Sequence, residues 1–389
     1  MDFSSIDIFC HCIDNFGDAG VAYRFAKEFK LARPGCRVRV FVDDMGTMRA
    51  VAGGVDPLLP VQEYESLTCV NTLSLDDALI NTLGVADVMV EMFACHIPKP
   101  LMELAYDNSK LIVNLEYLSA EDWVEDYHLK ESLLGRGSVR KFYFMPGFRE
   151  AAGGLIINSR LQKWREGGEL VFKEDDNQLV GTVFTYERGF DTLISDLADL
   201  GRETALLVFG DKSRRGISAT LGRLGVDVLD TRQYKYQYKN IQLLYMPFID
   251  QHSYDALLCC ADFNIVRGED SLARAVLSGR PFIWNAYIQD EKYQLVKVRA
   301  LLETMRGYFD DEDIFAAYSA LMLDFNGAPA ESLHQATSER YGSFFKNLKK
   351  YDRSAAAIYY FMLRNCNLIS KFCDFLDGYQ TGDAANNNQ

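Results

Sequence analysis

The chain carries two successive series in which short, continuous apolar segments alternate with helical patterns. Strand candidates in the first series are 6–13, 36–42, 86–93, 110–115 and, more weakly, 142–148, and those in the second are 179–186, 204–209, 241–247, 262–266 and 281–284. Continuous apolar runs, rather than alternating ones, are typical of parallel strands that are buried on both faces. The pattern predicts two α/β, Rossmann-like domains, each with a ligand site at the carboxyl ends of its strands.

The stretch from 156 to 177 separates the two series, because apolar residues become sparse there and charged residues frequent. We expect a first domain over 1–160 and a second over 178–350, which suits a chain of 389 residues. From 314 to 376 the pattern is almost wholly helical. The tail at 380–389 has too little apolar surface to order itself and is predicted to be disordered.

The net charge of the chain disfavours some classes of binding partner. Aspartate and glutamate total 55 against 41 lysines and arginines, a net charge of −14. This disfavours nucleic acid and anionic membranes, both of which attract basic surfaces. No apolar run approaches the ~20 residues that a membrane span needs.

Nine cysteines without a C-x-x-C pair favour free thiols in a reducing compartment, hence a cytoplasmic protein. We also expect a monomer, because no coiled-coil seam is visible.

The first loop that could form a functional site follows strand 6–13 and runs from Asp14 to Gly20. It places Asp14 and Asp18 four residues apart at the start of a helix, with Gly17 between them. One interpretation is structural, with Asp18 capping the helix and Asp14 closing an Asx turn. The other is a site for a cationic or hydroxyl-bearing substrate, since two acids exceed what capping needs. The loop lacks the G-x-G-x-x-G pattern, which disfavours a Rossmann oxidoreductase.

The second loop, 266–271, follows strand 262–266 and precedes another helix. Gly268 gives the turn freedom, and Asp270 or Ser271 could cap the helix, whose first turn is a typical phosphate site. Arg267 and Arg274 could add positive charge. Glu269 would oppose a bound phosphate unless it faces sugar hydroxyls or a cation, which favours a functional role.

Three further side chains follow strands of the second series. Phe248 could stack on a planar base and Gln251 could read its amide edge, although Phe248 could equally be a core residue. Tyr186 is either a ligand contact or a rim residue. In the first series, the segment 115–123 is dense in aromatics and acids and could line an acceptor cleft.

At these residues the sequence resembles the EarP-type protein-arginine rhamnosyltransferases along nearly its whole length. The resemblance is carried by the strings Ile8-Phe9-Cys10, Asp14-Asn15-Phe16-Gly17-Asp18, Asn114-Leu115-Glu116-Tyr117-Leu118-Ser119-Ala120-Glu121, Pro146-Gly147-Phe148, Gly153-Gly154-Leu155, Pro247-Phe248 and Val266-Arg267-Gly268-Glu269-Asp270-Ser271. It implies a GT-B glycosyltransferase, with two Rossmann-like domains facing across a cleft. It also implies that a C-terminal helix, at about 352–376, packs back on the first domain.

The resemblance further implies an inverting transfer of L-rhamnose from dTDP-β-L-rhamnose to one arginine of elongation factor P, which activates that factor for rescue of ribosomes stalled on polyproline. Asp14, Asp18 and Glu269 would be the catalytic carboxylates, with Asp18 the candidate base. The nucleotide sugar would be held by Asn15, Phe16, Gly17, Tyr186, Phe248, Gln251, Arg267, Gly268, Asp270 and Ser271.

We expect no metal and no other cofactor, because a nucleoside diphosphate leaves easily and a helix N-terminus can stabilise its charge. Two alternatives stay open. One is a GT-B transferase with a small-molecule or lipid acceptor. The other is a nucleotide-sugar-binding protein without catalysis, although all three acids are present.

Overall fold

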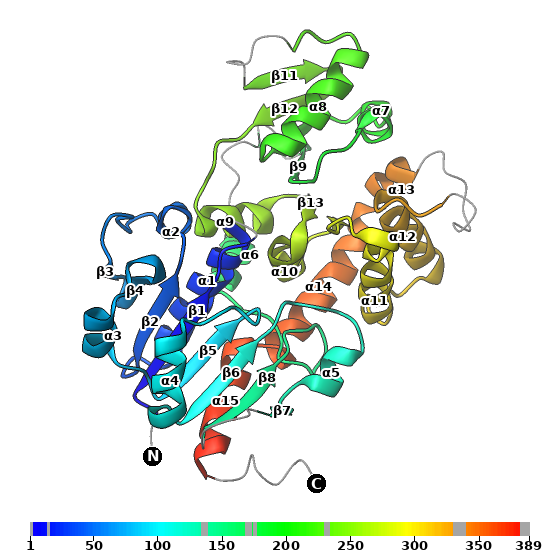
Figure 1. The fold of residues 1–389 in the computed structure, drawn as a ribbon. Coiled ribbons are helices and arrows are strands. Elements are labelled where there is room, and N and C mark those ends of the chain that lie inside the picture. Colours follow the sequence, from blue (N-terminus) through cyan, green and yellow to red (C-terminus); the bar gives the residue numbers. More distant parts are fainter. Residues whose placement is uncertain are drawn as a thin grey trace. The chain divides into compact units, whose positions relative to one another are not determined.

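A computed structural model describes residues 3–13, 16–133, 139–167, 173, 177–228, 234–329 and 340–381 of the chain. The chain forms two compact units. Unit 1 comprises Met1–Ser159 and Met362–Gln389, and unit 2 comprises Arg160–Phe361. Each unit contains a largely parallel sheet with helices packed against it (Figure 1), so the predicted α/β class is confirmed.

The sheet of unit 1 has, within the described residues, eight strands in the order β3-β4-β2-β1-β5-β6-β8-β7. Their bounds are β1 Ser5–Cys10, β2 Arg37–Val42, β3 Val61–Tyr64, β4 Leu67–Asn71, β5 Val88–Met92, β6 Leu111–Leu115, β7 Glu131–Ser132 and β8 Arg140–Phe144. Neighbouring strands pair in parallel except at the two edges, where β3 and β7 run antiparallel to their partners. The carboxyl ends of β1, β5 and β6 therefore lie at one edge of the sheet.

Helices cover both faces of this sheet. Their bounds are α1 Phe16–Ala32, α2 Met45–Ala52, α3 Asp77–Leu83, α4 Lys99–Asn108, α5 Trp123–Tyr127 and α15 Leu368–Thr381. Consecutive residues of β1 point to opposite cores: Ile8 packs with residues of α1, α2 and α15, and Phe9 packs with residues of α3 and α4. Burial on both faces explains why the strands are continuously apolar.

One apolar side chain of α1 lies outside the packed face of the helix. Leu31 follows the buried Phe29 by two positions, but it is 57% exposed. Two residues along a helix correspond to a rotation of about 200°. Leu31 therefore points away from the face that carries the buried Phe29.

The C-terminal helix α15 belongs to unit 1. Phe372 is buried and packs edge-on against Phe25, Phe29 and Phe144, with ring centroids 5.2, 5.8 and 5.3 Å away. The expected continuous helix at 352–376 is divided, because the Asn367 side chain accepts the N–H groups of Ile369 and Ser370 and begins a new helix. That helix continues to Thr381, so residues 380 and 381 are helical rather than disordered. The rest of the predicted tail, 382–389, lies outside the described residues.

The sheet of unit 2 has six described strands in the order β11-β12-β10-β9-β13-β14. Their bounds are β9 Leu179–Val183, β10 Thr204–Val208, β11 Lys235–Tyr238, β12 Ile241–Tyr245, β13 Phe263–Arg267 and β14 Phe282–Asn285. The edge strand β11 is antiparallel and the other pairs are parallel. The helices are α6 Leu161–Gly167, α7 Asp191–Asp199, α8 Asp211–Arg223, α9 Gln251–Cys260, α10 Gly268–Ser278, α11 Gln294–Arg306, α12 Glu312–Phe325, α13 Arg340–Lys346 and α14 Leu348–Asn365.

Unit 2 extends beyond the expected bounds of 178–350 at both ends. The reason lies in α6, which packs on α9. Its Arg165 guanidinium stands 4.8 Å from the ring centroid of Tyr359 on α14 and donates to the Gly279 carbonyl at 3.4 Å. These contacts join residues before 178 and after 350 to the same core.

Candidate active site

The first site region lies in unit 1, where the chain leaves β1 and enters α1. Asp18 stands in the first turn of α1 and is 2% exposed. Its Oδ2 accepts the backbone N–H of Ile13 at 3.0 Å. An N-cap carboxylate precedes its helix and accepts from N–H groups inside it, whereas Asp18 lies inside the helix and accepts from a residue before it. Asp18 is therefore not the N-cap residue of α1, although its carboxylate accepts a backbone N–H group.

The other residues predicted in this loop have different outcomes. Phe16 and Gly17 are the first two residues of α1, and Phe16 is 48% exposed. Asp14 and Asn15 lie outside the described residues. The acid that the structure does describe is thus a buried carboxylate at the carboxyl end of β1.

A tyrosine from the end of β6 reaches the same carboxylate. The Tyr117 hydroxyl donates to Asp18 Oδ1 at 3.3 Å, so each oxygen of the carboxylate accepts a hydrogen bond. The Tyr117 ring stacks on Phe93, with centroids 4.0 Å apart and planes inclined by 10°. Two elements of the sheet therefore meet at Asp18, and the buried anion they hold suits a cationic ligand.

The turn after β5 that carries Phe93 is strained. Phe93 and Ala94 have φ angles of 59° and 49°, in the left-handed region that non-glycine residues rarely adopt. Each such residue costs on the order of 1 kcal/mol or more. Asn114, 2% exposed, holds the turn by accepting the Ala94 N–H at 3.1 Å, and its amide donates to Glu116 at 2.6 Å.

A histidine–aspartate pair lies at the ends of β1 and β2. Asp43 accepts a hydrogen bond from the Cys12 N–H at 2.9 Å and is paired with His11 through Nδ1. Partial burial raises the pKa of Asp43, but these two hydrogen bonds outweigh it and hold the pKa below its ordinary value. Asp43 is thus a further anion at this edge of the sheet.

The second site region lies in unit 2, at the junction of β13 and α10. Gly268 has a φ of 67° and lets the strand turn directly into the helix. The indole N–H of Trp284 donates to the Gly268 carbonyl at 2.9 Å and fixes this turn. The helix begins at Gly268, so the expectation that Asp270 or Ser271 caps it is wrong. Both lie in its first turn.

Glu269 has a cationic partner. Lys297 on α11 donates from Nζ to Glu269 Oε1 at 2.8 Å. The two side chains are 25% and 27% exposed, so the pair is only partly screened by solvent. An acid at this helix N-terminus is therefore balanced by a lysine that is distant in sequence.

Arg267 and Tyr186 lie together beside this turn. The Arg267 guanidinium stacks over the rings of Phe184 and Tyr186, 4.3 and 4.9 Å from their centroids, and donates to the Thr185 carbonyl at 3.2 Å. The Tyr186 hydroxyl would lie 3.6 Å from a Cβ atom placed on Gly268. The positively charged Arg267 guanidinium thus lies beside the N-terminus of α10, and this combination suits the binding of a diphosphate.

Arg274 does not add to this charge. Its side chain is buried, 3.9 Å from carboxylate oxygens of Asp255 and of Asp270. Its location in the interior of unit 2 corrects the expectation that it faces a phosphate.

Phe248 follows β12, and 60% of it is exposed. The core-packing alternative is therefore wrong for this residue. Gln251 begins α9 next to the N-cap residue Asp250, whose carboxylate accepts the N–H groups of His252 and Ser253 at 3.0 and 3.1 Å. Partial burial raises the pKa of Asp250, but the Ser253 hydroxyl, which donates to the carboxylate at 2.6 Å, and these two N–H groups outweigh it and lower the pKa. An accessible aromatic ring and an amide thus lie near each other in sequence at a strand end.

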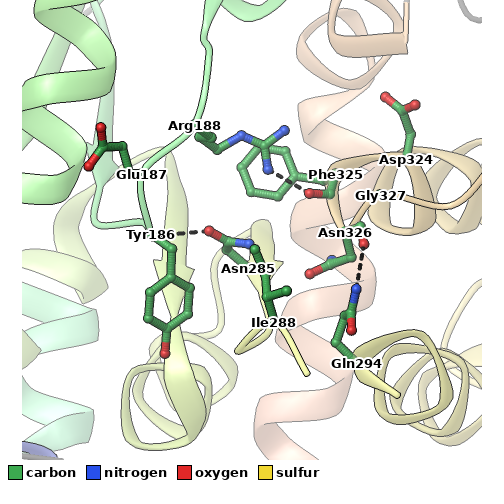
Figure 2. A pocket seen from close by; sticks show the side chains of 10 residues that line it. All are labelled: Tyr186, Glu187, Arg188, Asn285, Ile288, Gln294, Asp324, Phe325, Asn326 and Gly327. Carbon is green, nitrogen blue, oxygen red and sulfur yellow. Dashed lines mark hydrogen bonds between the residues drawn. The ribbon is translucent and has the colours of Figure 1, made fainter. Parts of the chain in front are cut away.

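A pocket of about 260 Å³ opens beside Tyr186, at the carboxyl ends of β9 and β14. Figure 2 shows its lining: Tyr186, Glu187, Arg188, Asn285, Ile288, Gln294, Asp324, Phe325, Asn326 and Gly327. The Asn285 side chain accepts the Tyr186 N–H at 3.0 Å, and Arg188 lies 3.4 Å from the centroid of the Phe325 ring. Burial lowers the pKa of Arg188. The pocket continues the second site region on the side of β14.

Two features are absent from the described residues, namely a metal-binding cluster and a membrane-spanning helix. Nowhere in that part of the chain do three or more His, Cys, Asp or Glu side chains gather where a metal ion could be held. None of the described helices has the length and apolarity that crossing a membrane requires.

The sequence did not single out three of the residues that shape these regions. Phe93 and Ala94 shape the site by their left-handed backbone conformation, which no residue pattern predicts. Lys297 lies in the middle of an amphipathic helix, 28 positions from Glu269. Tyr117 was predicted only as a member of an aromatic segment after a strand, and that position is the one signal that could have identified it.

The chain matches the family model described as "Elongation-Factor P (EF-P) rhamnosyltransferase EarP" over residues 6–377. It is 34% identical over 338 residues to a protein-arginine rhamnosyltransferase of Pseudomonas putida, covering 82% of this chain and 87% of the relative. A Neisseria meningitidis protein of the same name is 32% identical over 337 residues, covering 84% and 85%.

A solved structure described as "Structural basis for EarP-mediated arginine glycosylation of translation elongation factor EF-P" superposes with a TM-score of 0.61 at 20% identity. The match covers 97% of this chain and 99% of that one. This likeness supports the GT-B class of the fold. The chain therefore belongs to the EarP family of protein-arginine rhamnosyltransferases and is a glycosyltransferase.

Proposed function

We propose that the enzyme transfers L-rhamnose from dTDP-β-L-rhamnose to an arginine of elongation factor P, with inversion at the anomeric carbon. Family membership supports the reaction class. The observation that carries the acceptor assignment is the buried Asp18 carboxylate, whose two oxygens are held by Ile13 and Tyr117. A fixed anion at a strand end is suited to an arginine side chain, which carries a positive charge at every physiological pH.

The chemistry demands more than binding. A guanidinium has a pKa above ~12, so Asp18 cannot remove its proton in advance. We propose that the carboxylate clamps the guanidinium and takes the proton during attack. The attacking nitrogen forms its bond to the sugar carbon as the bond from that carbon to the diphosphate oxygen breaks, and the electron pair leaves with dTDP. The product guanidinium keeps its positive charge.

The donor is assigned to the second site region. Phe248 would stack on thymine and Gln251 would read its amide edge, while Arg267 and the first turn of α10, including Asp270 and Ser271, would hold the diphosphate. The helix N-terminus and the guanidinium stabilise the charge that develops on the leaving group, so the proposal needs no metal and no general acid. Tyr186 would complete the site beside Gly268.

The cellular setting follows from the acceptor. Elongation factor P acts on ribosomes, so the proposal places the enzyme in the cytoplasm, where its product would relieve stalling on polyproline. The nine cysteines, all within the described part of the chain, are free thiols, which suits a reducing compartment.

The test uses the purified enzyme, elongation factor P from the same source and dTDP-β-L-rhamnose, with and without EDTA. We expect tandem mass spectrometry to find one deoxyhexose on one arginine in both arms, and nuclear magnetic resonance to show the inverted anomer. An elongation factor P variant with lysine at that arginine is the control. Failure to modify the protein, or transfer to a small-molecule acceptor instead, would contradict the acceptor assignment, and loss of activity in EDTA would contradict metal independence.

A further inference from the structure

Tyr117 and Asp18 come from different parts of unit 1 and meet at one hydrogen bond. The Tyr117 hydroxyl donates to Asp18 Oδ1 at 3.3 Å, while the Ile13 N–H donates to Oδ2 at 3.0 Å. The aspartate is 2% exposed and the tyrosine 39%. Two donors on opposite oxygens of the carboxylate thus fix its plane.

The Tyr117 ring packs against Phe93, which belongs to a strained turn. It lies parallel to Phe93 at a centroid distance of 4.0 Å. Phe93 and its neighbour Ala94 both adopt left-handed backbone conformations, which are kept in place by the Phe93 N–H bonded to the Leu115 carbonyl at 2.7 Å and by the side chain of Asn114. Strain of this kind persists only where the surrounding structure fixes it, and it concentrates at functional sites. Here the strained backbone places the Phe93 ring against the ring of Tyr117.

We propose that Tyr117 is a positioning residue for glycosyl transfer to arginine. Its hydroxyl holds the Asp18 carboxylate in the one orientation from which that group can take the proton of the attacking nitrogen. The phenol keeps its own proton throughout, because the bond it makes is a donation to the carboxylate. This inference rests on the proposed role of Asp18 and adds the residue that orients its carboxylate.

The geometry distinguishes positioning from binding. The Tyr117 hydroxyl contacts the carboxylate, and in the proposed site the carboxylate contacts the guanidinium. Removing the hydroxyl leaves the negative charge in place, so the arginine should still bind. What is lost is the fixed direction of the carboxylate during attack, where small misplacements reduce the rate steeply.

The first variant is Tyr117→Phe, which keeps the ring and its stack on Phe93 and removes only the hydroxyl. We expect kcat for glycosylation of elongation factor P to fall by about tenfold. KM for elongation factor P, Kd for dTDP-β-L-rhamnose and the melting temperature should stay close to those of the wild type. The matched control is Tyr143→Phe, which also removes a hydroxyl hydrogen bond in unit 1, the one at 3.3 Å from Ser132, and should keep the wild-type kcat.

A second variant, Phe93→Leu, keeps the hydroxyl and removes the stacked ring. We expect a smaller loss of kcat, again without a change in donor affinity. An unchanged kcat in Tyr117→Phe would overturn the inference, and so would an equal loss in the Tyr143→Phe control. A wild-type enzyme that does not modify elongation factor P would overturn the proposed function and this inference together, so the two failures are distinguishable.

Discussion

Lys297 on α11 donates a hydrogen bond of 2.8 Å to the carboxylate of Glu269 in the first turn of α10. In the proposed donor site, this pair offsets the repulsion that an acid would exert on a diphosphate at the N-terminus of α10. The lysine charge offsets the carboxylate, and the ion pair limits the rotamers that Glu269 can adopt. In the proposed site, a carboxylate held in this way could face the sugar without repelling the diphosphate.

Replacement of that lysine by a neutral residue of similar length, Lys297→Met, should therefore reduce kcat. A partly exposed ion pair contributes about 1 kcal/mol, which corresponds to a loss of about fivefold. The affinity for dTDP should fall by a similar factor, because the Glu269 carboxylate would no longer be offset and would repel the diphosphate. Arg306→Gln breaks a more exposed ion pair of unit 2, the one with Glu312 at 2.7 Å, and should not affect turnover. Normal kcat in Lys297→Met would show that the pair does not serve Glu269.

Phe248 offers a test of donor binding, because an exposed ring can be removed without opening a cavity in the core. Stacking of an aromatic side chain on a base contributes about 1–3 kcal/mol. We expect Phe248→Ala to weaken dTDP binding about tenfold or more by isothermal titration calorimetry, with an unchanged melting temperature. Tyr360→Ala removes another exposed aromatic of unit 2 and should leave dTDP affinity intact. Equal affinity in Phe248→Ala and the wild type would contradict the thymine assignment.

Asp87 gives the stability of unit 1 a pH dependence. Partial burial raises the pKa of this carboxyl, but hydrogen bonds from Lys110 at 2.8 Å and from Ser4 at 2.7 Å outweigh it and lower the pKa to about 2. The unfolded chain has a value near ~3.9. The carboxylate therefore contributes about 2 kcal/mol to the free energy of unfolding above about pH 4, and this contribution is lost as the pH falls toward 2.

The variant Asp87→Asn should accordingly be less stable than the wild type by about 2 kcal/mol at pH 7, and the difference should shrink between pH 4 and pH 2. Urea unfolding at a series of pH values measures it. The exposed acid Asp313 provides the control, since Asp313→Asn should not change the curve. A difference between Asp87→Asn and the wild type that stays constant down to pH 2 would refute this role of Asp87.

The strands that build the two sheets could be predicted because burial on both faces makes them continuously apolar. β9 and β10 are examples, with every residue buried. The strands that were missed lie at or near sheet edges. β3 reads Val-Gln-Glu-Tyr and β11 reads Lys-Tyr-Gln-Tyr, and such polar runs become strands only because a neighbouring strand offers hydrogen bonds.

The loops of the candidate site could be predicted from the positions of the strands, but the contacts within the site could not. Parallel strands place ligands at their carboxyl ends, which led to the loops containing Asp18 and Glu269. Their partners could not be predicted. Tyr117 reaches Asp18 across 99 positions, and Lys297 pairs with Glu269 from another helix, so both depend on tertiary structure that no local pattern encodes.

In the proposed mechanism, the Asp18 carboxylate accepts the proton of the acceptor arginine. Asn has nearly the same shape as Asp but neither its charge nor its basicity. The matched control is Asp77→Asn, which neutralises an exposed acid in the first turn of α3 in the same unit and should behave as the wild type.

The most direct measurement is the turnover of Asp18→Asn on elongation factor P, followed by mass spectrometry, together with its Kd for dTDP-β-L-rhamnose. We predict that kcat falls by about a thousandfold while donor affinity changes by less than about twofold. Near-normal turnover of Asp18→Asn would contradict the account.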